Sequence, residues 1–445
     1  MFTKICLKNF RSFDNIEFDL TNKNGSPKAV SIIYGENGAG KSNLISAFVL
    51  LNEILQTMDI RDAYEEFLSQ SVFKNEEIGS EIRQRILSSI RDINAIINDY
   101  RMVGSTGNIL AEYEFNIFGK TGKYIIEFGE NEIVHERLEY TIHRRRGIYF
   151  DCTKESLSIN NAIVNNKDFY LDIKSSVRKY WGKHSVFSII LHELHDKSES
   201  YGRENISVNF NDVIDAFRLV SCSLGIGSRQ WSKLRAPYEV FENADAGEIA
   251  KRDEYQLDIA EKVLTQIFAS INSSIQKVYY KRKYNDEKID YQLYFEKMIS
   301  GCYRNIPFSK ESTGNHQILN VLCYLICACL GATIVIDEAD SGIHDFLFLR
   351  IFQDIYPNIC PEVGGQIILT THNTLLMQAE FSRDATYIIR ETENGSKEVR
   401  CISNYEKRTY INNNIRSKYL ANDYGGMPTV KPIDFVKVLQ EIRDA

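Results

Sequence analysis

The segment YGENGAGKSNLI has the composition of a phosphate-binding loop. It contains the pattern G-x-x-x-x-G-K-[ST], with a β-branched stretch (30–34) before it and a helical pattern from Asn43 onward, which is the context that such a loop requires. Glycines let backbone N–H groups turn toward phosphate oxygens, and the start of a helix adds partial positive charge. We expect Lys41 to reach the β- and γ-phosphates of a nucleotide and the Ser42 hydroxyl to bind Mg²⁺. The loop residues expected around the phosphates are Asn37, Gly38, Gly40, Lys41 and Ser42.

A second set of reactive groups follows two apolar strands later in the chain. Asp337 and Glu338 end the strand of ATIVIDEADSG, and His372 ends the strand of QIILTTHN. A buried strand that ends in unpaired carboxylates is unfavourable unless the carboxylates meet a cation. We interpret Asp337 as part of the magnesium shell and Glu338 as the group that orients or deprotonates an attacking water. His372 is interpreted as a contact to the γ-phosphate or to that water, although a histidine alone is more often a local hydrogen-bonding residue.

The elements that must position these groups follow from the residue pattern. The first forty residues are strand-rich, a helical stretch follows, and alternating strands separated by turns then predict an antiparallel meander. After a mostly helical and polar middle, the chain alternates helix and strand, which is typical of a parallel sheet. We therefore expect an α/β fold in which the middle is inserted between two halves. The expected parts are an N-terminal half with an antiparallel β lobe (1–150), a mainly helical insertion with a hairpin (151–300) and a C-terminal half (301–445).

Composition excludes several classes of protein. The 445 residues carry a net charge of −7, so a strongly basic nucleic-acid coat is absent. The apolar run 318–336 is long enough for a membrane span, but we interpret it as a buried helix followed by the strand that carries the two acids. The nine cysteines lack paired zinc spacing and no secretory signal is evident. We expect a cytoplasmic protein without a membrane segment.

The letters D-E-A-D, from Asp337 to Asp340, also occur in a family of RNA helicases. Those helicases carry the phosphate loop much closer to these acids and have a second motor domain after them. Here Lys41 lies almost 300 residues before Asp337, the rest of the chain is short, and the next strand ends in T-T-H-N rather than an S-A-T type. The helicase interpretation is disfavoured on all three grounds.

The complete motif set resembles ABC-type ATPases of the SMC, RecF and overcoming-lysogenisation-defect (OLD) group. It is most similar to the stand-alone ATPases of phage-defence operons, such as the ATPase subunits of PARIS and Septu systems. The segments that carry the resemblance are LKNFRSFDNIEFDL, YGENGAGKSNLI, PFSKESTGNHQILNVL, IDEADSGIH, TTHN and NNIRSKYLANDYGGMP. They span most of the chain, although the middle matches only in pattern. The resemblance implies a P-loop NTPase fold of the ABC-ATPase head type, with ATP and Mg²⁺ as cofactors.

The resemblance also implies roles for individual residues. Arg11 stands near the nucleotide phosphates, and Asn37 and Asn43 belong to the family's phosphate loop. In the segment E-S-x-G, Ser312 and Gly314 cap the γ-phosphate bound to a second protomer. The residues from Asp340 to His344 form the D-loop region that faces that protomer.

The signature segment departs from the transporter form L-S-G-G-Q. Thr313 replaces the first glycine, and Asn315 and His316 follow. Read from its residues alone, KESTGNHQILNVL is the capped start of an apolar helix, and a plain helix cap stays open as an alternative. No Q-loop glutamine is assigned, because Gln56, Gln70 and Gln84 all lie in helical patterns.

Weaker signals favour ordinary structural roles. The segment LHELHD spaces its histidines three apart, so we interpret His192, Glu193, His195 and Asp196 as parts of a surface helix rather than a zinc site. The stretches HRRRG, VRKYWGKH and YYKRKY suit nucleic-acid phosphates, but solvated strand faces are the favoured interpretation. No Toprim pattern follows the last strand, so we expect no intrinsic nuclease.

Three functions remain open at this point. The first is a defence ATPase that forms at least a homodimer, controls a separately encoded effector, for which we expect a nuclease, and responds to a phage protein. The second is a RecF-like repair ATPase that clamps DNA, and DNA is the less favoured partner. The third is a scaffold stabilised by ATP.

Overall fold

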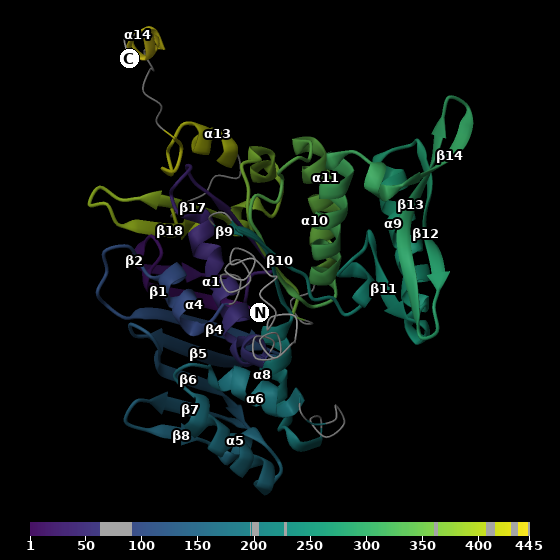
Figure 1. Ribbon diagram of the computed structural model, residues 1–445. Helices are drawn as coiled ribbons and strands as arrows, with labels where there is room; N and C mark the ends of the chain where they lie inside the picture. Colours follow the sequence, from purple (N-terminus) through teal and green to yellow (C-terminus); the bar gives the residue numbers. More distant parts are fainter. Residues whose placement is uncertain are drawn as a thin grey trace.

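The computed structural model of the chain describes residues 1–62, 91–195, 197, 204–226, 229–359, 364–405, 414–428 and 435–443. Two seven-stranded sheets and a four-stranded sheet make up the β structure of these residues. Helix α1 (Lys41–Ile54) packs between the two large sheets (Figure 1). A hydrogen bond from the Tyr113 hydroxyl to the Ala47 carbonyl fixes α1 on the first sheet.

The first large sheet is antiparallel, with the strand order β2-β1-β4-β5-β6-β7-β8. Along β4 every second residue is buried, because one face of the sheet packs on the core and the other faces outward. The strands are β1 (Phe2–Phe10), β2 (Phe13–Asp19), β4 (Ile109–Ile117), β5 (Lys120–Phe128), β6 (Ile133–Ile142), β7 (Arg145–Thr153) and β8 (Leu157–Ile159). The helices that share its apolar core are α4 (Ile93–Tyr100), α5 (Lys167–Tyr180), α6 (Val186–His195) and α8 (Val208–Arg218).

The second large sheet is the central sheet, with the strand order β10-β9-β15-β16-β3-β17-β18. Its five middle strands are mutually parallel: β9 (Val220–Ile226), β15 (Thr333–Ile336), β16 (Gln366–Thr370), β3 (Val30–Tyr34) and β17 (Thr386–Glu391). The antiparallel edge strands are β10 (Arg229–Lys233) and β18 (Lys397–Cys401). Every residue of β3, β15 and β16 is buried, because helices cover both faces.

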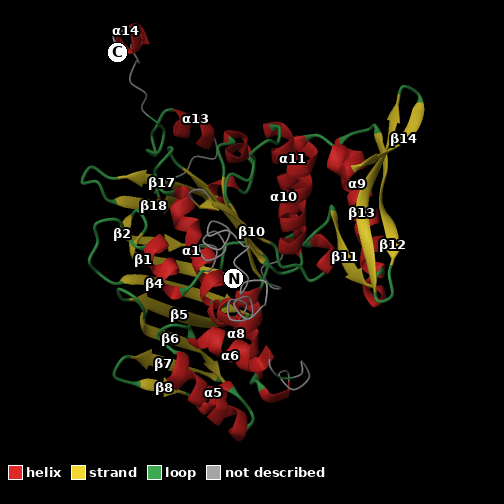
Figure 2. Cartoon of the chain, viewed as in Figure 1, coloured by secondary structure: helices red, strands yellow, loops and turns green. Residues whose placement is uncertain are grey.

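Helices α10 (Thr313–Cys329) and α11 (Asp345–Ile355) pack on the face of the central sheet opposite to α1. Beyond them stands an arm in which helix α9 covers one face of the small sheet, and Figure 2 shows α10 and α11 between the central sheet and this arm. The arm consists of β11 (Ala246–Ala250), α9 (Tyr255–Ile271), β12 (Ile275–Tyr284), β13 (Lys288–Ile299) and β14 (Cys302–Pro307). The remaining α-helices of the described residues are α12 (Ser382–Ala385), α13 (Ile415–Leu420) and α14 (Phe435–Arg443), and the 3-10 helix η8 (Thr374–Gln378) lies between β16 and α12.

The middle of the chain differs from the expected helical insertion. The expected boundary at residue 150 falls inside β7, and the segment 151–300 contributes β9 and β10 to the central sheet as well as three strands of the arm. Sequence patterning missed β9 because its residues are small and partly polar. Ser221 on β9 is fully buried, and its hydroxyl exchanges hydrogen bonds with the Arg235 backbone. The segment 151–300 therefore contributes strands to the central sheet as well as to the arm.

The apolar run 318–336 forms most of α10 and the whole of β15, as predicted. Both elements pack in the interior of the protein. In the described ranges of the chain, no helix combines the length and apolar character needed to cross a bilayer.

Candidate functional site

The register of the central sheet brings the predicted motifs to one edge. Ile336 of β15 lies opposite Leu369 of β16, and Thr370 of β16 lies opposite Ile33 of β3. Because these strands are parallel neighbours, their carboxyl ends meet at the same edge of the sheet, where ligands bind in open α/β sheets. The phosphate loop, the two acids and the histidine therefore follow adjacent strand ends.

The lysine of the phosphate loop makes hydrogen bonds to carbonyl oxygens of the loop itself. Lys41 Nζ donates to the carbonyl oxygens of Gly35 at 2.8 Å and Glu36 at 3.1 Å. The Lys41 side chain is buried, and this burial lowers its pKa, while the carboxylates of Asp337 and Glu338 oppose the shift. A cation held by two neutral carbonyls in a buried position is poised to accept an anion.

Two glycines shape the loop. Gly40 has a φ of +108° at the start of α1, and a Cβ there would lie 2.9 Å from the Phe13 ring. At Gly35 a Cβ would lie 2.5 Å from the Ile389 carbonyl oxygen of β17. The loop therefore needs glycine at Gly40 for a left-handed backbone and at Gly35 for close approach of two chain segments.

The hydroxyl of Thr370 makes hydrogen bonds to both acidic residues that follow β15. The Thr370 hydroxyl donates to Asp337 Oδ1 at 2.5 Å and accepts from the Glu338 backbone N–H at 2.8 Å. The Asp337 N–H donates to the Ser223 carbonyl on β9. Glu338 has a φ of +47°, a left-handed backbone conformation that residues other than glycine rarely adopt. This turn directs the exposed Glu338 side chain away from the strand, and backbone strain of this kind is often found at functional sites.

A cavity of about 390 Å³ lies at this edge. Ser42, Asp337 and Glu338 line one part of it, and Gln317 and Asn320 of α10 line another. Sequence reasoning missed these two amides, because Gln317 and Asn320 follow the E-S-x-G residues in an apolar helical pattern and only the packing of α10 brings them to the acids.

The oxygen atoms in this cavity suit nucleotide-bound Mg²⁺. Ser42 offers a hydroxyl and Asp337 a carboxylate, and Mg²⁺ in nucleotide sites is usually held by one or two protein oxygens together with phosphates and water. Within the described ranges, no cluster of three or more His, Cys, Asp or Glu side chains could hold a metal ion on its own. The residues therefore fit a metal that arrives with a nucleotide better than a separate metal cage.

The Arg11 side chain packs on Tyr100. Its backbone is left-handed, with a φ of +51°, and its guanidinium carbon lies 4.6 Å from the centroid of the Tyr100 ring. Its Nε and Nη2 atoms are buried and have no hydrogen-bond partner among the described residues. Its neighbour Ser12 accepts a 2.9 Å hydrogen bond from Asn43 Nδ2, which ties the first hairpin to α1. Asn43 thus has a structural contact, and the role of Arg11 near the phosphates stays a prediction.

The segment TTHN, at the end of β16, is held by hydrogen bonds of Asn373, whereas His372 is exposed. Asn373 is buried, its Nδ2 donates to the Asp345 carbonyl, and its Oδ1 accepts from the Leu375 N–H. His372 is exposed at the strand end, next to the phosphate-loop edge. Its role toward the γ-phosphate or water stays a prediction.

The signature segment begins α10 as the pattern predicted. The Ser312 hydroxyl caps the helix by accepting from the Asn315 N–H at 3.3 Å. Ser312 is exposed, and a Cβ at Gly314 would lie 3.6 Å from the Gly342 carbonyl in the D-loop region of the same chain. Neither Ser312 nor Gly314 lines the cavity that holds the acids. Their capping of a nucleotide on a second protomer stays a prediction.

The D-loop region contains a further orphan group. Asp340 Oδ1 is buried and has no hydrogen-bond partner in the part of the chain that the structure describes. His344 caps α11 through Nδ1, which accepts from the Phe346 N–H at 3.2 Å. The structure thus gives His344 a capping role in this state and leaves Asp340 available for another contact.

The weaker sequence signals have structural partners. His192 contacts Asp62, and Glu193 accepts from the Ser176 hydroxyl, so the LHELHD segment is part of a packed helix surface; Asp196 lies outside the described residues. Gln56 donates to the Asn52 carbonyl, which is a local helix contact. Gln70 and Gln84 also lie outside the described residues.

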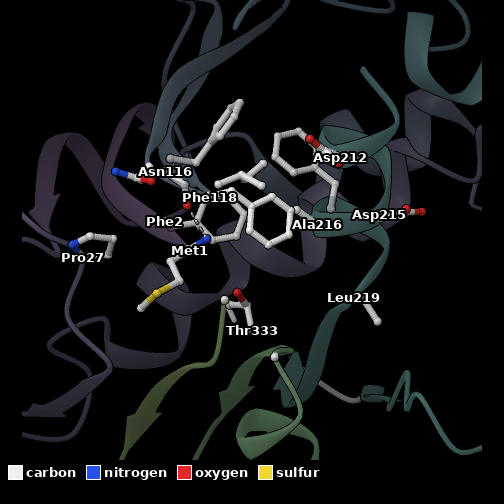
Figure 3. Close-up of a pocket in the computed structure, with 16 residues that line it drawn as sticks. Met1, Phe2, Pro27, Asn116, Phe118, Asp212, Asp215, Ala216, Leu219 and Thr333 are labelled. Carbon is white, nitrogen blue, oxygen red and sulfur yellow. Dashed lines mark hydrogen bonds between the residues drawn. The ribbon is translucent and has the colours of Figure 1, made fainter. Parts of the chain in front are cut away.

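A second cavity, of about 400 Å³, lies at the opposite edge of the central sheet (Figure 3). Thr333, the first residue of β15, lines it together with Phe2 and Leu219. None of the predicted site residues lines this cavity. Because Ser42, Asp337 and Glu338 line the polar cavity at the carboxyl edge of the sheet, we take that cavity as the candidate site.

One comparison with known proteins, the match to a family model, agrees with this geometry. Residues 30–378 match the family described as "AAA domain, putative AbiEii toxin, Type IV TA system". A search of curated proteins found no match. A matching solved structure is the SMC head domain from Thermotoga maritima, with 14% identity and a TM-score of 0.38, covering 90% of this chain and 98% of that chain.

Proposed function

Because the chain belongs to this AAA-domain family, we propose that it binds ATP with Mg²⁺ at the carboxyl edge of β3, β16 and β15 and hydrolyses it. The observation that carries the proposal is the cavity that Ser42, Asp337 and Glu338 share. These residues come from two distant parts of the sequence, and their types match the three needs of phosphoryl transfer: metal binding, charge balance and water activation.

Each residue has a task that its position supports. Lys41 exchanges its two carbonyl partners for phosphate oxygens, and the loop N–H groups bind the same phosphates. Ser42 and Asp337 hold Mg²⁺, which neutralises charge on the β- and γ-phosphates when bound. The Thr370 hydroxyl fixes the Asp337 carboxylate in one orientation. Glu338 orients the attacking water and accepts its proton, and His372 assists from the neighbouring strand end.

We further propose that two copies of the chain pair through composite ATP sites. The exposure of Ser312 at the start of α10 supports this step, because a helix start with free N–H groups can bind a phosphate on a partner. The unpaired Asp340 Oδ1 in the adjacent D-loop region supports the same surface. ATP then acts as the link between two protomers.

The output that we propose is control of a separately encoded effector, a nuclease, in anti-phage defence, with a phage protein as trigger. Support comes from the resemblance to stand-alone defence ATPases and from the family description, which names a type IV toxin–antitoxin system. The absence of a Toprim pattern in the sequence suits an effector on another chain.

A DNA clamp is the second candidate, and one surface favours it. On the open face of the arm sheet, the Tyr279 and Tyr294 rings stack at 5.7 Å and Lys281 lies 6.0 Å from the centroid of the Tyr294 ring. Lysines and aromatic rings together suit nucleic acid. However, Arg282 of the same stretch is already paired with three carboxylates of the α9 side, Glu254, Asp258 and Glu261.

The test of the main proposal is ATP turnover by the purified chain and its Glu338→Gln variant. We expect the variant to bind ATP as tightly as the wild type and to lose about two to three orders of magnitude in turnover, because Gln cannot accept the water proton. Light scattering of the variant with ATP and Mg²⁺ should show a dimer that Ser312→Trp prevents. Unchanged turnover in Glu338→Gln would refute the catalytic role of Glu338, a wild type that binds ATP without turnover would favour the scaffold, and salt-dependent DNA binding at physiological ionic strength would favour the clamp.

A further inference from the structure

The phosphate loop receives a contact from a lysine outside all of the recognised motifs. Lys397 begins β18, and its Nζ donates to the Gly38 carbonyl oxygen at 3.0 Å. The same Nζ lies 6.0 Å from the centroid of the Phe13 ring at the start of β2. The hydrogen bond joins residues that are 359 positions apart. A second ammonium group therefore stands beside the loop, in addition to that of Lys41.

The charge of Lys397 is not balanced by a carboxylate in the described structure. Its cross-strand neighbour on β17 is Glu391, and the two form no ion pair. The next residue, Glu398, is paired with Arg390 and Arg400. An ammonium group has three donors, and the neutral Gly38 carbonyl occupies one of them. Lys397 can therefore exchange a neutral acceptor for an anion without breaking an ion pair.

The strand order indicates which part of a nucleotide Lys397 can reach. β17 and β18 lie on one side of β3, whereas β16 and β15, which carry the acids, lie on the other. The γ-phosphate is expected near Asp337 and Glu338, where the reaction takes place. Lys397 approaches the loop from the opposite side of β3, toward the end of the phosphate chain that leads to the nucleoside.

We propose that Lys397 is a nucleotide-binding residue that leaves the Gly38 carbonyl and contacts the phosphate chain at its α-phosphate end. The proposal rests on the proposed function, in which this loop binds ATP. ATP and ADP share the α-phosphate end, so Lys397 contributes equally to the affinity for both. Glu338, by contrast, acts on the γ-phosphate reaction alone.

The test is equilibrium binding of fluorescent ATP and ADP analogues to the full chain and to four variants: Lys397→Ala, Lys397→Gln, Lys397→Arg and Lys154→Ala. Lys154→Ala is the matched control, because Lys154 is an exposed lysine that follows β7 in the first large sheet. Lys397→Gln keeps a donor for the Gly38 carbonyl and removes the charge. Thermal unfolding without nucleotide checks that each variant is folded.

We expect Lys397→Ala and Lys397→Gln each to weaken ATP and ADP binding about tenfold, as the loss of a hydrogen bond to a charged group predicts. The loss should shrink at high salt, Lys397→Arg should retain most of the affinity, and Lys154→Ala should match the wild type. Wild-type affinity in Lys397→Gln, or a loss confined to ATP, would overturn the proposal. A wild-type chain that binds neither nucleotide would instead refute the proposed function.

Discussion

At the amino ends of β15 and β16, the buried Gln366 side chain makes three hydrogen bonds to backbone groups. At the carboxyl ends of the same strands, the buried Asp340 Oδ1 has no hydrogen-bond partner among the described residues. Gln366 is fully buried, its Oε1 accepts from the Phe2 N–H, and its Nε2 donates to the carbonyls of Phe2 and Lys28. This one side chain joins β1 to the central sheet. The cavity at this end is mostly apolar and includes none of the predicted site residues.

The carboxyl ends of the same strands have the opposite character. Asp340 has a buried carboxylate oxygen that lacks a hydrogen-bond partner among the described residues, and Glu338 has a left-handed backbone. Such features lower the stability of a protein unless a ligand or partner supplies the missing contacts. The difference teaches that the chain uses one end of the sheet for folding and leaves the other end incomplete for binding. Substitutions at the two ends should therefore separate stability from function.

The largest effect is expected for Lys41→Ala at the carboxyl end. The variant should lose about a thousandfold or more in ATP affinity, because at least two charge-assisted hydrogen bonds to phosphate disappear. Its free energy of unfolding without nucleotide should change little or rise, since a buried cation is removed. Isothermal titration and urea unfolding measure the two quantities, with the exposed Lys154→Ala as control. Full ATP affinity in Lys41→Ala would refute the phosphate-loop assignment.

Gln366→Ala should give the reverse result at the amino end. Three buried backbone groups, on Phe2 and Lys28, lose their partner, so the free energy of unfolding should fall by about 3 kcal/mol. ATP affinity of the folded variant should stay within about threefold of the wild type, because no phosphate contact is changed. The exposed Gln292→Ala on the arm is the control. A variant with normal stability and weak ATP binding would contradict the comparison.

Thr370→Val tests a residue that serves both purposes. The hydroxyl bonds Asp337 and the Glu338 N–H, and valine has the same shape without either bond. Turnover should fall about tenfold and the free energy of unfolding by about 1 to 2 kcal/mol. Thr370→Ser keeps the hydroxyl and should restore most of the turnover. Equal turnover in the valine and serine variants would show that the hydroxyl does not position Asp337.

The smallest effect is a difference in stability that comes from the backbone conformation of Glu338. Both Glu338→Gly and Glu338→Ala remove the carboxylate and should abolish turnover equally. Only glycine adopts a φ of +47° without strain, so Glu338→Gly should be more stable than Glu338→Ala by about 1 kcal/mol. Thermal or urea unfolding of the two variants measures the difference. Equal stabilities would mean that the carboxyl end of β15 stores no strain.

Local motifs made the reactive groups predictable from the sequence. The phosphate loop and the acids after β15 are short segments whose residue types carry their chemistry, and the structure brings them to one edge of the sheet. The helix cap at Ser312 was also predictable, because a cap depends on residues within one turn. The extent of the central sheet was not, since the small, partly polar residues of β9 have no strong strand pattern and become buried only through pairing with β15.

The sequence by itself determined the P-loop NTPase fold, the two acids and the expected cofactors, because these depend on residue type and on neighbours along the chain. Tertiary structure alone decided which distant groups complete the site: Thr370 on Asp337, Lys397 on Gly38, and the amides of α10 in the cavity. Each of these contacts depends on strand order, register and helix packing between segments far apart in the chain. The physical reason is that a parallel sheet places strand ends together regardless of their distance in sequence, and no local pattern records that placement.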